Sequence, residues 1–316
     1  MNRSWRKSGR SRVSAWCILV LLILVGQSTN AQVTPWVDIL LHNGHLFVES
    51  EIAGIPGYSL IDTGADINGI NKQFLEENDL SFPKAGEIKV FGAFGSAYRD
   101  TYKEIPAKIF GTELKFTDLT ETNLGPAENQ LILGAGFLKL LIFQIDYPNQ
   151  KIRAMSRESI QLKKLRNVES KRDLYRKSPI VKVRLNDEID VWLLLDTGYT
   201  GGILLDRQFV KKQGWLERHE SIDSEARGVI SSGNMERFNL PSMLFGGYRI
   251  ENPIISMPGE GEDMAFFGKQ NVYGNRVRYR TRKAQGILGY DVLKHFVLTI
   301  DYKNGYVHVE PESSTN

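Results

Sequence analysis

Residues 62–64 and residues 196–198 both read Asp-Thr-Gly, and each triplet follows an aliphatic run. An acidic residue that ends an apolar run and precedes Thr and Gly is typical of a carboxylate carried from a buried strand onto a tight turn. With average composition, a given position begins Asp-Thr-Gly by chance roughly two times in ten thousand. Two copies in a chain of 316 residues therefore indicate a shared role.

A pair of aspartates held together can supply both an acid and a base. Two carboxylates at hydrogen-bonding distance do not both ionise easily, so one keeps a proton and the pair titrates as a unit. The ionised member can take a proton from a bound water while the protonated member donates to a substrate carbonyl oxygen. This chemistry hydrolyses an amide without a covalent intermediate. The sequence therefore predicts Asp62 and Asp196 as catalytic residues.

The residues that follow the two aspartates suit this task. Gly64 and Gly198 let the backbone approach the carboxylates closely, and their N–H groups can hold the outer oxygens. Thr63 and Thr197 offer hydroxyls that can bond between the two loops and lock them together. With Ala65, these residues are predicted to support the active-site loops.

An internal repeat explains why each half of the chain has one aspartate. The Asp-Thr-Gly motifs are 134 residues apart, whereas the triplets at 132–134 (Ile-Leu-Gly) and 287–289 (Ile-Leu-Gly) are 155 apart. The second copy is therefore 21 residues longer between its motifs, and the excess is expected within residues 257–283. That region contains four alternating arginines at 276–282, predicted to form an exposed strand edge. Two homologous halves related by a twofold axis would bring Asp62 and Asp196 face to face.

Extended segments surround both motifs and favour an all-β fold. Alternation and turn residues predict strands at 36–41, 46–52, 58–61, 179–185 and 191–195, with short amphipathic segments at 71–78 and 203–214. Residues 88–115 alternate around glycines, as in one long hairpin with its tip near 91–95. This tip and its counterpart at 228–233 are predicted to cover the catalytic pair and exclude water. The candidate residues of these flaps are Gly92, Phe94, Gly95, Gly228, Ile230 and Gly233.

The first 31 residues differ from the rest of the chain. They combine five basic residues, an apolar run from Ala15 to Val25 interrupted only by Cys17, and small residues at 28–31. This layout predicts a secretory signal cleaved after Ala31, hence a periplasmic or secreted protein; the alternative is an uncleaved membrane anchor through residues 13–27. Without residues 1–31 the formal charge falls from +3 to −2, which gives no reason to expect a nucleic-acid partner. The only cysteine would leave with the signal, so no disulfide is expected.

The chain is predicted to have four parts: the signal at 1–31, a first lobe at 32–155, a linker at 156–177 and a second lobe at 178–316. The linker is dense in Lys and Arg with acids between them, and it lacks a strong apolar face. Such a segment is expected to be partly helical and to direct its charges to solvent. His42 and His45 have no further Cys, His or paired acids nearby in sequence, so no metal site and no cofactor are predicted.

Four motifs in this order resemble those of retropepsin-like aspartic proteases, with both lobes fused in one polypeptide. Residues 62–66, Asp-Thr-Gly-Ala-Asp, match the retroviral form of the first motif, and the triplets at 132–134 and 287–289 match the second. The resemblance covers nearly all of residues 36–312. It implies an all-β, bilobal acid-protease fold of two homologous β-barrel lobes with pseudo-twofold symmetry. It also implies a monomeric aspartic endopeptidase that acts on peptides or unfolded proteins.

Three positions near the motifs leave alternatives open. Tyr199 stands where the family usually has a small residue, so a bulky ring has to be placed beside the pair. Its presence favours a second hypothesis, a peptide-binding protein that keeps the fold without turnover. Ala65 lacks the hydroxyl of pepsin-type enzymes, and the resemblance then implies a less acidic optimum. Asp66 is expected either to bind substrate or to pair with an arginine between the lobes.

Overall fold

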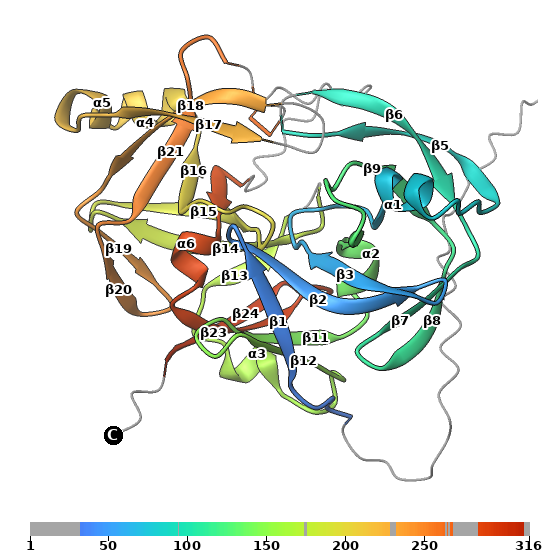
Figure 1. The fold of residues 1–316 in the computed structure, drawn as a ribbon. Helices are drawn as coiled ribbons and strands as arrows, with labels where there is room; N and C mark the ends of the chain where they lie inside the picture. The colour runs from blue at the N-terminus through green and yellow to red at the C-terminus, as the bar shows by residue number, and fades with distance from the viewer. Residues whose placement is uncertain are drawn as a thin grey trace, which may run out of the picture.

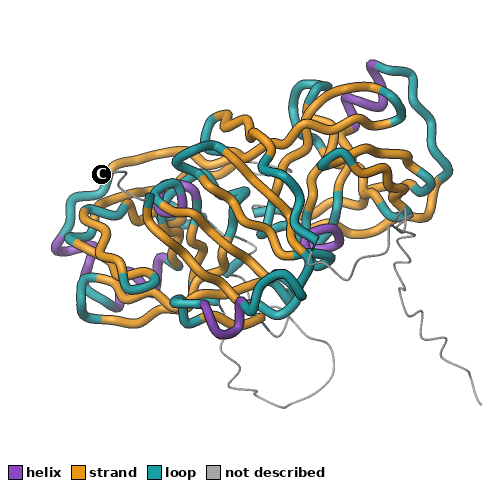
Figure 2. Tube along the Cα trace, turned by 90° about the horizontal axis from the view of Figure 1, so that it is seen from below, coloured by secondary structure: helices purple, strands orange, loops and turns teal. Residues whose placement is uncertain are grey.

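The computed structural model describes residues 32–93, 95–173, 176–227, 232–262, 264, 266–267 and 284–312. Within these ranges strands predominate and helices are short, as Figure 2 shows. The strands form two large sheets, one of 14 and one of ten strands (Figure 1). The prediction that the chain is all-β is therefore confirmed. The predicted signal at 1–31 lies outside the described residues, among which no helix is long and apolar enough to cross a membrane.

The first half of the chain alternates short strands with two brief helices. Its elements are β1 (Val37–His42), β2 (His45–Ile52), β3 (Ile55–Ile61), β4 (Gly69–Asn71), α1 (Lys72–Glu77), β5 (Lys84–Phe91), β6 (Ser96–Tyr102), β7 (Ile105–Ile109), β8 (Thr112–Phe116), β9 (Leu119–Thr122), β10 (Asn129–Leu133), α2 (Ala135–Leu138), β11 (Ile142–Asp146) and β12 (Lys151–Met155).

The second half has the same texture. Its elements are α3 (Leu162–Leu165), β13 (Ser170–Arg172), β14 (Pro179–Leu185), β15 (Ile189–Leu195), β16 (Ile203–Leu205), α4 (Arg207–Lys212), α5 (Trp215–Arg218), β17 (Ile222–Arg227), β18 (Ser232–Asn239), β19 (Ser242–Phe245), β20 (Tyr248–Glu251), β21 (Ile254–Pro258), β22 (Gly286–Leu288), α6 (Tyr290–Leu293), β23 (Phe296–Asp301) and β24 (Tyr306–Pro311).

The repeat in the sequence recurs in the pairing of the strands. In the first half β3 runs parallel to β10, which is antiparallel to β4, and β4 is parallel to β9. The second half has the same pattern: β15 runs parallel to β22, β22 is antiparallel to β16, and β16 is parallel to β21. Six residues connect β9 to β10, whereas 27 connect β21 to β22. Most of the additional residues of the second half therefore lie where the sequence comparison expects them; the alternating arginines at 276–282 are outside the described residues.

The two halves are also joined through one sheet. The order of the larger sheet is β24-β23-β11-β12-β1-β2-β3-β10-β4-β9-β6-β5, with β7 and β8 attached to β2. The last two strands of the chain thus belong to the sheet of the first half, and β23 pairs with β11 over five residue pairs. The smaller sheet has the order β17-β18-β21-β16-β22-β15-β14-β19-β20, with β13 on β14.

One expected element is different in the structure. Residues 88–115 do not form one long hairpin, because β5 and β6 pair with each other and β7 pairs with β8. The chain leaves β6 at Tyr102, and Glu104 adopts a positive φ of 64° before β7 begins. This break redirects the chain to β2, with which β7 pairs. The predicted hairpin tip at 91–95 remains between β5 and β6.

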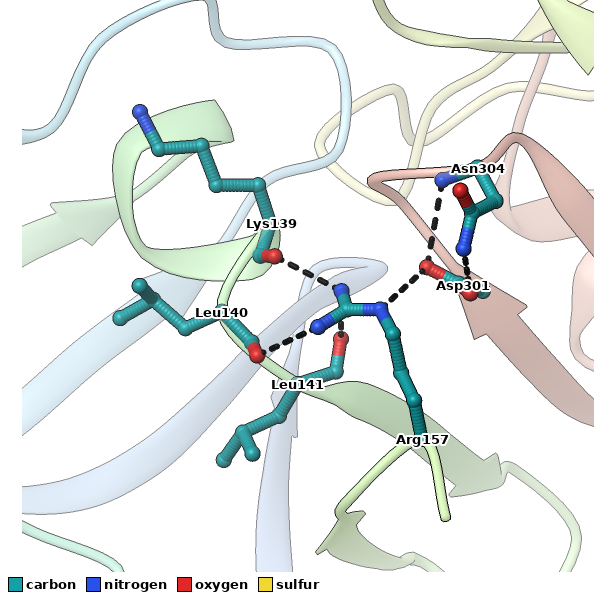
Figure 3. Close-up of polar contacts among 6 residues, drawn as sticks. All are labelled: Lys139, Leu140, Leu141, Arg157, Asp301 and Asn304. Carbon is teal, nitrogen blue, oxygen red and sulfur yellow. Dashed lines mark hydrogen bonds and ion pairs between the residues drawn. The ribbon is translucent and has the colours of Figure 1, made fainter.

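The charged segment at 156–177 is only partly exposed to solvent. It contains α3 and β13, and Leu162 and Val168 are buried in apolar clusters. Arg157 donates to the carboxylate of Asp301 at 3.2 Å and to the carbonyl oxygens of residues 139, 140 and 141 (Figure 3). The prediction that its charges face solvent is therefore wrong for Arg157. Its side chain is 23% exposed, and that of Asp301 is 4% exposed.

We expect Arg157→Met to lower the free energy of unfolding by about 2–3 kcal/mol, because it leaves the buried carboxylate of Asp301 without its cation. The matched control is Lys84→Met, which breaks the ion pair with Asp100 at a surface where Lys84 is 64% exposed. That change should cost clearly less than Arg157→Met, because solvent screens an exposed ion pair. Urea denaturation followed by circular dichroism measures both, and equal losses would contradict a special role for Arg157.

Candidate active site

The two Asp-Thr-Gly loops begin where β3 and β15 end. The N–H of Asp62 donates to the carbonyl oxygen of Leu133, the last residue of β10, at 3.2 Å. In the second half the N–H of Asp196 donates to Leu288 of β22 at 2.9 Å. Each aspartate is therefore held at the carboxyl end of two parallel buried strands. The Ile-Leu-Gly triplets noted in the sequence supply these neighbouring strands.

The structure brings Asp62 and Asp196 together, although 134 residues separate them. Their side chains share a hydrogen bond. Each carboxylate also lies against the glycine of the opposite loop. A Cβ atom at Gly64 would overlap the carboxylate of Asp196, and one at Gly198 would overlap that of Asp62. Only glycine at these two positions allows this approach of the two loops.

Backbone N–H groups hold one oxygen of each carboxylate. Gly64 and Ala65 donate to Oδ1 of Asp62 at 2.8 and 2.9 Å. Gly198 and Tyr199 donate to Oδ1 of Asp196 at 2.8 and 3.1 Å. The same two donors in each loop therefore fix the orientation of each carboxylate. These four bonds do not involve Oδ2 of either group.

The two threonines lock the loops to each other, as their sequence positions predict. The hydroxyl of Thr63 donates to the carbonyl oxygen of Leu195 at 2.7 Å and accepts from the N–H of Thr197 at 2.9 Å. In the reverse direction, the hydroxyl of Thr197 donates to Ile61 at 2.7 Å and accepts from the N–H of Thr63 at 3.1 Å. Both threonines are buried. Four hydrogen bonds thus cross between the halves directly behind the carboxylates.

Burial and proximity set the protonation of the pair. Burial raises the pKa of Asp62, while the N–H groups of Gly64 and Ala65 oppose this rise. Burial and the negative charge of Asp62 raise the pKa of Asp196 well above its usual range. Because ionising the second carboxylate would place two negative charges together, the pair keeps one proton beyond the pH at which an ordinary aspartate loses it. One acid and one base thus coexist in the same site.

The ring of Tyr199 packs against Gly201 and Gly289. Its hydroxyl hydrogen-bonds to Ser256 on β21, and burial raises the pKa of this phenol to about 12. A side chain at Gly201 or at Gly289 would overlap the Tyr199 ring. These glycines make room for the ring within the second half. The sequence analysis noted that this ring has to be placed beside the pair but did not find the space for it.

Asp66 contacts groups from the start of the second half. The hydroxyl of Ser178 donates to Oδ1 of Asp66 at 3.5 Å and accepts from the hydroxyl of Tyr302 at 2.9 Å. Partial burial raises the pKa of Asp66, and the charge of Arg176 opposes the rise. This environment fits the expected pairing with an arginine between the halves. Sequence reasoning did not find Ser178 or Tyr302, since neither lies in a recognisable motif.

The predicted flap residues fall partly within the described structure. Gly92 donates its N–H to the carbonyl oxygen of Gly95 at 2.8 Å and so closes the turn between β5 and β6. Gly233 lies inside β18, where it pairs with Ala226 of β17. Figure 1 shows the β5–β6 and β17–β18 hairpins extending toward each other from opposite sides of the molecule. Phe94, Gly228 and Ile230 lie outside the described residues.

No protein-family model matches the chain, and no curated protein matches its sequence. Among the residues that the structure describes, no group of three or more His, Cys, Asp and Glu side chains is arranged to hold a metal ion.

We expect Thr63→Val to destabilise the protein, because it leaves the carbonyl oxygen of Leu195 and the N–H of Thr197 buried without partners. Each such loss costs about 1–3 kcal/mol. Thr63→Ser keeps the hydroxyl and should restore most of the stability. Thr112→Val, at an exposed position on β8, is the control and should change the free energy of unfolding by less than about 0.5 kcal/mol. Urea denaturation measures the free energy of unfolding of each variant. An unchanged value for Thr63→Val would contradict a stabilising role of the hydrogen bonds between the two loops.

The raised pKa values predict a pH-dependent effect of Asp196→Asn. Because the pKa of Asp196 is higher in the folded than in the unfolded protein, its protonated form stabilises the wild type. This stabilisation is complete below the unfolded pKa of about 3.9 and is lost as the pH rises through the folded pKa. The amide does not titrate, so the variant should be more stable than the wild type at pH 7. This difference should shrink toward pH 4. Urea denaturation between pH 4 and 8 tests it, with exposed Asp38→Asn as the control; a pH-independent difference would contradict the raised values.

Proposed function

We propose that the protein is an aspartic endopeptidase in which Asp62 and Asp196 activate one water molecule between them. The observation that carries this proposal is the hydrogen bond between two partly buried carboxyl groups, each of which has its Oδ1 held by two backbone N–H groups. Such a pair holds one proton, which supplies a general acid beside a general base. It needs no further group to hydrolyse an amide.

The proposed reaction follows from this protonation state. The ionised carboxylate takes a proton from water, and the resulting hydroxide attacks the carbonyl carbon of the peptide bond. The protonated carboxylate donates its proton to the carbonyl oxygen, which gives a tetrahedral diol. The carboxyl group that took the proton from water then gives it to the amide nitrogen. As the C–N bond breaks, one hydroxyl of the diol returns its proton to the other carboxylate, which restores the shared proton of Asp62 and Asp196. The backbone donors to both Oδ1 atoms keep the carboxylates oriented throughout.

The strand pairings support a bilobal acid-protease fold with pseudo-twofold symmetry. The equivalent pairings around β3 and β15, and the reciprocal bonds of Thr63 and Thr197, are what an axis between the two aspartates would produce. Each lobe then supplies half of the site, and a single chain is sufficient for the complete pair. We further propose that the protein acts as an exported monomer on peptides or unfolded proteins, without a nucleic-acid partner.

The rival function is peptide binding without turnover, for which Tyr199 was the motivating residue. The ring of Tyr199 is turned toward Ser256 and the glycines at 201 and 289, and its N–H still serves Asp196. The tyrosine at position 199, where the family usually has a small residue, therefore leaves the hydrogen bonds to the Asp196 carboxylate in place. This observation favours the enzyme over the binding protein.

We expect Asp62→Asn and Asp196→Asn each to lower kcat/KM for an unfolded protein or a fluorogenic peptide by about 10³-fold or more, because each removes the acid–base pair. Asp38→Asn, at an exposed site on β1, should retain full activity. Circular dichroism confirms that the variants are folded. If the wild type and both variants bind peptides equally and none cleaves them, the endopeptidase is wrong and the binding protein is right.

A further inference from the structure

Asn68 ends the loop that carries Asp62 and lies just before β4. The residue is buried, with 6% of its surface exposed. Its side-chain oxygen Oδ1 accepts the N–H of Gly134 at 3.0 Å and the N–H of Phe137 at 3.2 Å. These two N–H groups belong to the start of α2, the short helix that follows β10. The side chain of Asn68 therefore ties the end of the active-site loop to the start of α2.

Helix α2 in turn holds the backbone beside the carboxylate. Its first residue, Ala135, donates its N–H to the carbonyl oxygen of Ala65 at 2.9 Å. The N–H of Ala65 is one of the two donors that hold Oδ1 of Asp62. A Cβ atom at Gly134 would overlap the backbone of the loop, so the start of α2 lies directly against it. Hydrogen bonds therefore connect Asn68, through α2 and Ala65, to the carboxylate of Asp62.

Two further contacts fix the position of Asn68. Its carbonyl oxygen accepts the N–H of Thr120 on β9 at 3.1 Å. A Cβ atom at Gly136 would lie 2.5 Å from Nδ2 of Asn68, so the amide packs closely on the first turn of α2. An amide oxygen can accept two hydrogen bonds, and Oδ1 uses both on the start of α2. The side chain cannot turn without giving up these bonds.

The second half holds the corresponding glycine without a side chain. Gly202 stands 134 residues after Asn68, and its carbonyl oxygen accepts the N–H of Gly289 at 2.8 Å. Gly289 is the counterpart of Gly134 in the repeated Ile-Leu-Gly triplet. A Cβ atom at Gly202 would lie 2.6 Å from the carbonyl oxygen of Ile254, which leaves no room for a side chain. Equivalent N–H groups are thus bound by a side chain in one half and by the backbone in the other.

We propose that Asn68 is a positioning residue of the catalytic pair, which through α2 and Ala65 holds the carboxylate of Asp62 in the orientation that hydrolysis needs. This role rests on the proposed endopeptidase function. Asn68 acts through other groups and is not itself a catalytic residue. The loop of Asp62 therefore depends on one side chain at a place where the loop of Asp196 depends on backbone alone.

The main test is Asn68→Ala, which leaves the buried N–H of Gly134 without its acceptor. We expect kcat for a fluorogenic peptide to fall by about 10–100-fold, because a small displacement of a reacting group is this costly, while KM changes by less than about threefold. Asn68→Asp keeps an oxygen acceptor in the same place and should restore kcat to within about threefold of the wild type, each at its optimum pH. No recovery in Asn68→Asp would overturn the proposal.

The matched control is Asn71→Ala. Asn71 is also buried, and its Oδ1 accepts two backbone N–H groups, those of Gln73 and Leu124, each at 3.2 Å. These bonds hold the start of α1 and the connection between β9 and β10 rather than the active-site loop. Urea denaturation should therefore show that both variants lose stability, whereas only Asn68→Ala should lose kcat. Equal losses of kcat in the two variants would overturn the proposal, because Asn68 would then act on stability alone.

A second variant displaces the Asn68 amide without removing it and serves if Asn68→Ala does not fold. Gly136→Ala puts a methyl group into the space of the amide and should lower kcat in the same direction. In the Asn68→Ala background the same change should cost little more, since the group that it displaces is gone. An unchanged kcat in Gly136→Ala, or additive losses in the double variant, would overturn the proposal.

A readout without cleavage separates this role from the proposed function. The N–H of Ala65 lowers the pKa of Asp62, so weakening that bond in Asn68→Ala should move the titration of the pair to higher pH. Carbon NMR of labelled aspartate measures this titration, with the resonances of the pair identified by their loss in Asp62→Asn and Asp196→Asn.

The two kinds of failure then differ. If the wild type cleaves no peptide, the proposed endopeptidase is wrong, while a shifted titration in Asn68→Ala and an unshifted one in Asn71→Ala still support the positioning of Asp62. An unchanged titration in Asn68→Ala would overturn the positioning role itself.

Discussion

The reciprocal bonds of Thr63 and Thr197 are the interaction on which the site depends. Two carboxylates with raised pKa values resist being brought together, since burial and mutual repulsion both disfavour their charged forms. The four hydrogen bonds behind them hold the loops at a fixed separation and leave little freedom for the loops to move apart. Because these threonines are buried, their bonds do not compete with water. The free energy of folding thus maintains a site that the carboxylates alone would not form.

The rest of the fold supports this cross-link from both sides. The loops are anchored on β10 and β22 by the N–H groups of Asp62 and Asp196. In the larger sheet, β23 pairs with β11, and Arg157 joins the turn before β11 to the end of β23. A displacement of one half against the other would strain these contacts as well as the threonines. The halves are therefore fixed at two places, one beneath the carboxylates and one in the shared sheet.

Much of this arrangement could be predicted from the sequence because it is local. Asp62 and Asp196 end strands that the aliphatic runs predict, and the placement of glycine and threonine in each loop follows from short-range chemistry. The two-residue alternation also located β14 at its observed bounds, 179–185. Contacts that depend on the relative position of distant segments could not be predicted in this way. Arg157 bonding to Asp301, Ser178 lying between Asp66 and Tyr302, and the division of residues 88–115 into two hairpins are examples.

The two halves have equivalent backbones around the aspartates, but the side chains next to the aspartates differ. Ala65 and Tyr199 occupy equivalent positions and donate equivalent N–H groups, yet only the second carries a ring that needs its own space. The space is provided by Gly201 and Gly289, within the same half that holds the long connection between β21 and β22. The half that carries Asp196 therefore has larger groups near the pair, whereas the two carboxylates and their N–H donors are equivalent. The four backbone donors therefore keep the two carboxylates equivalent although the side chains around them differ.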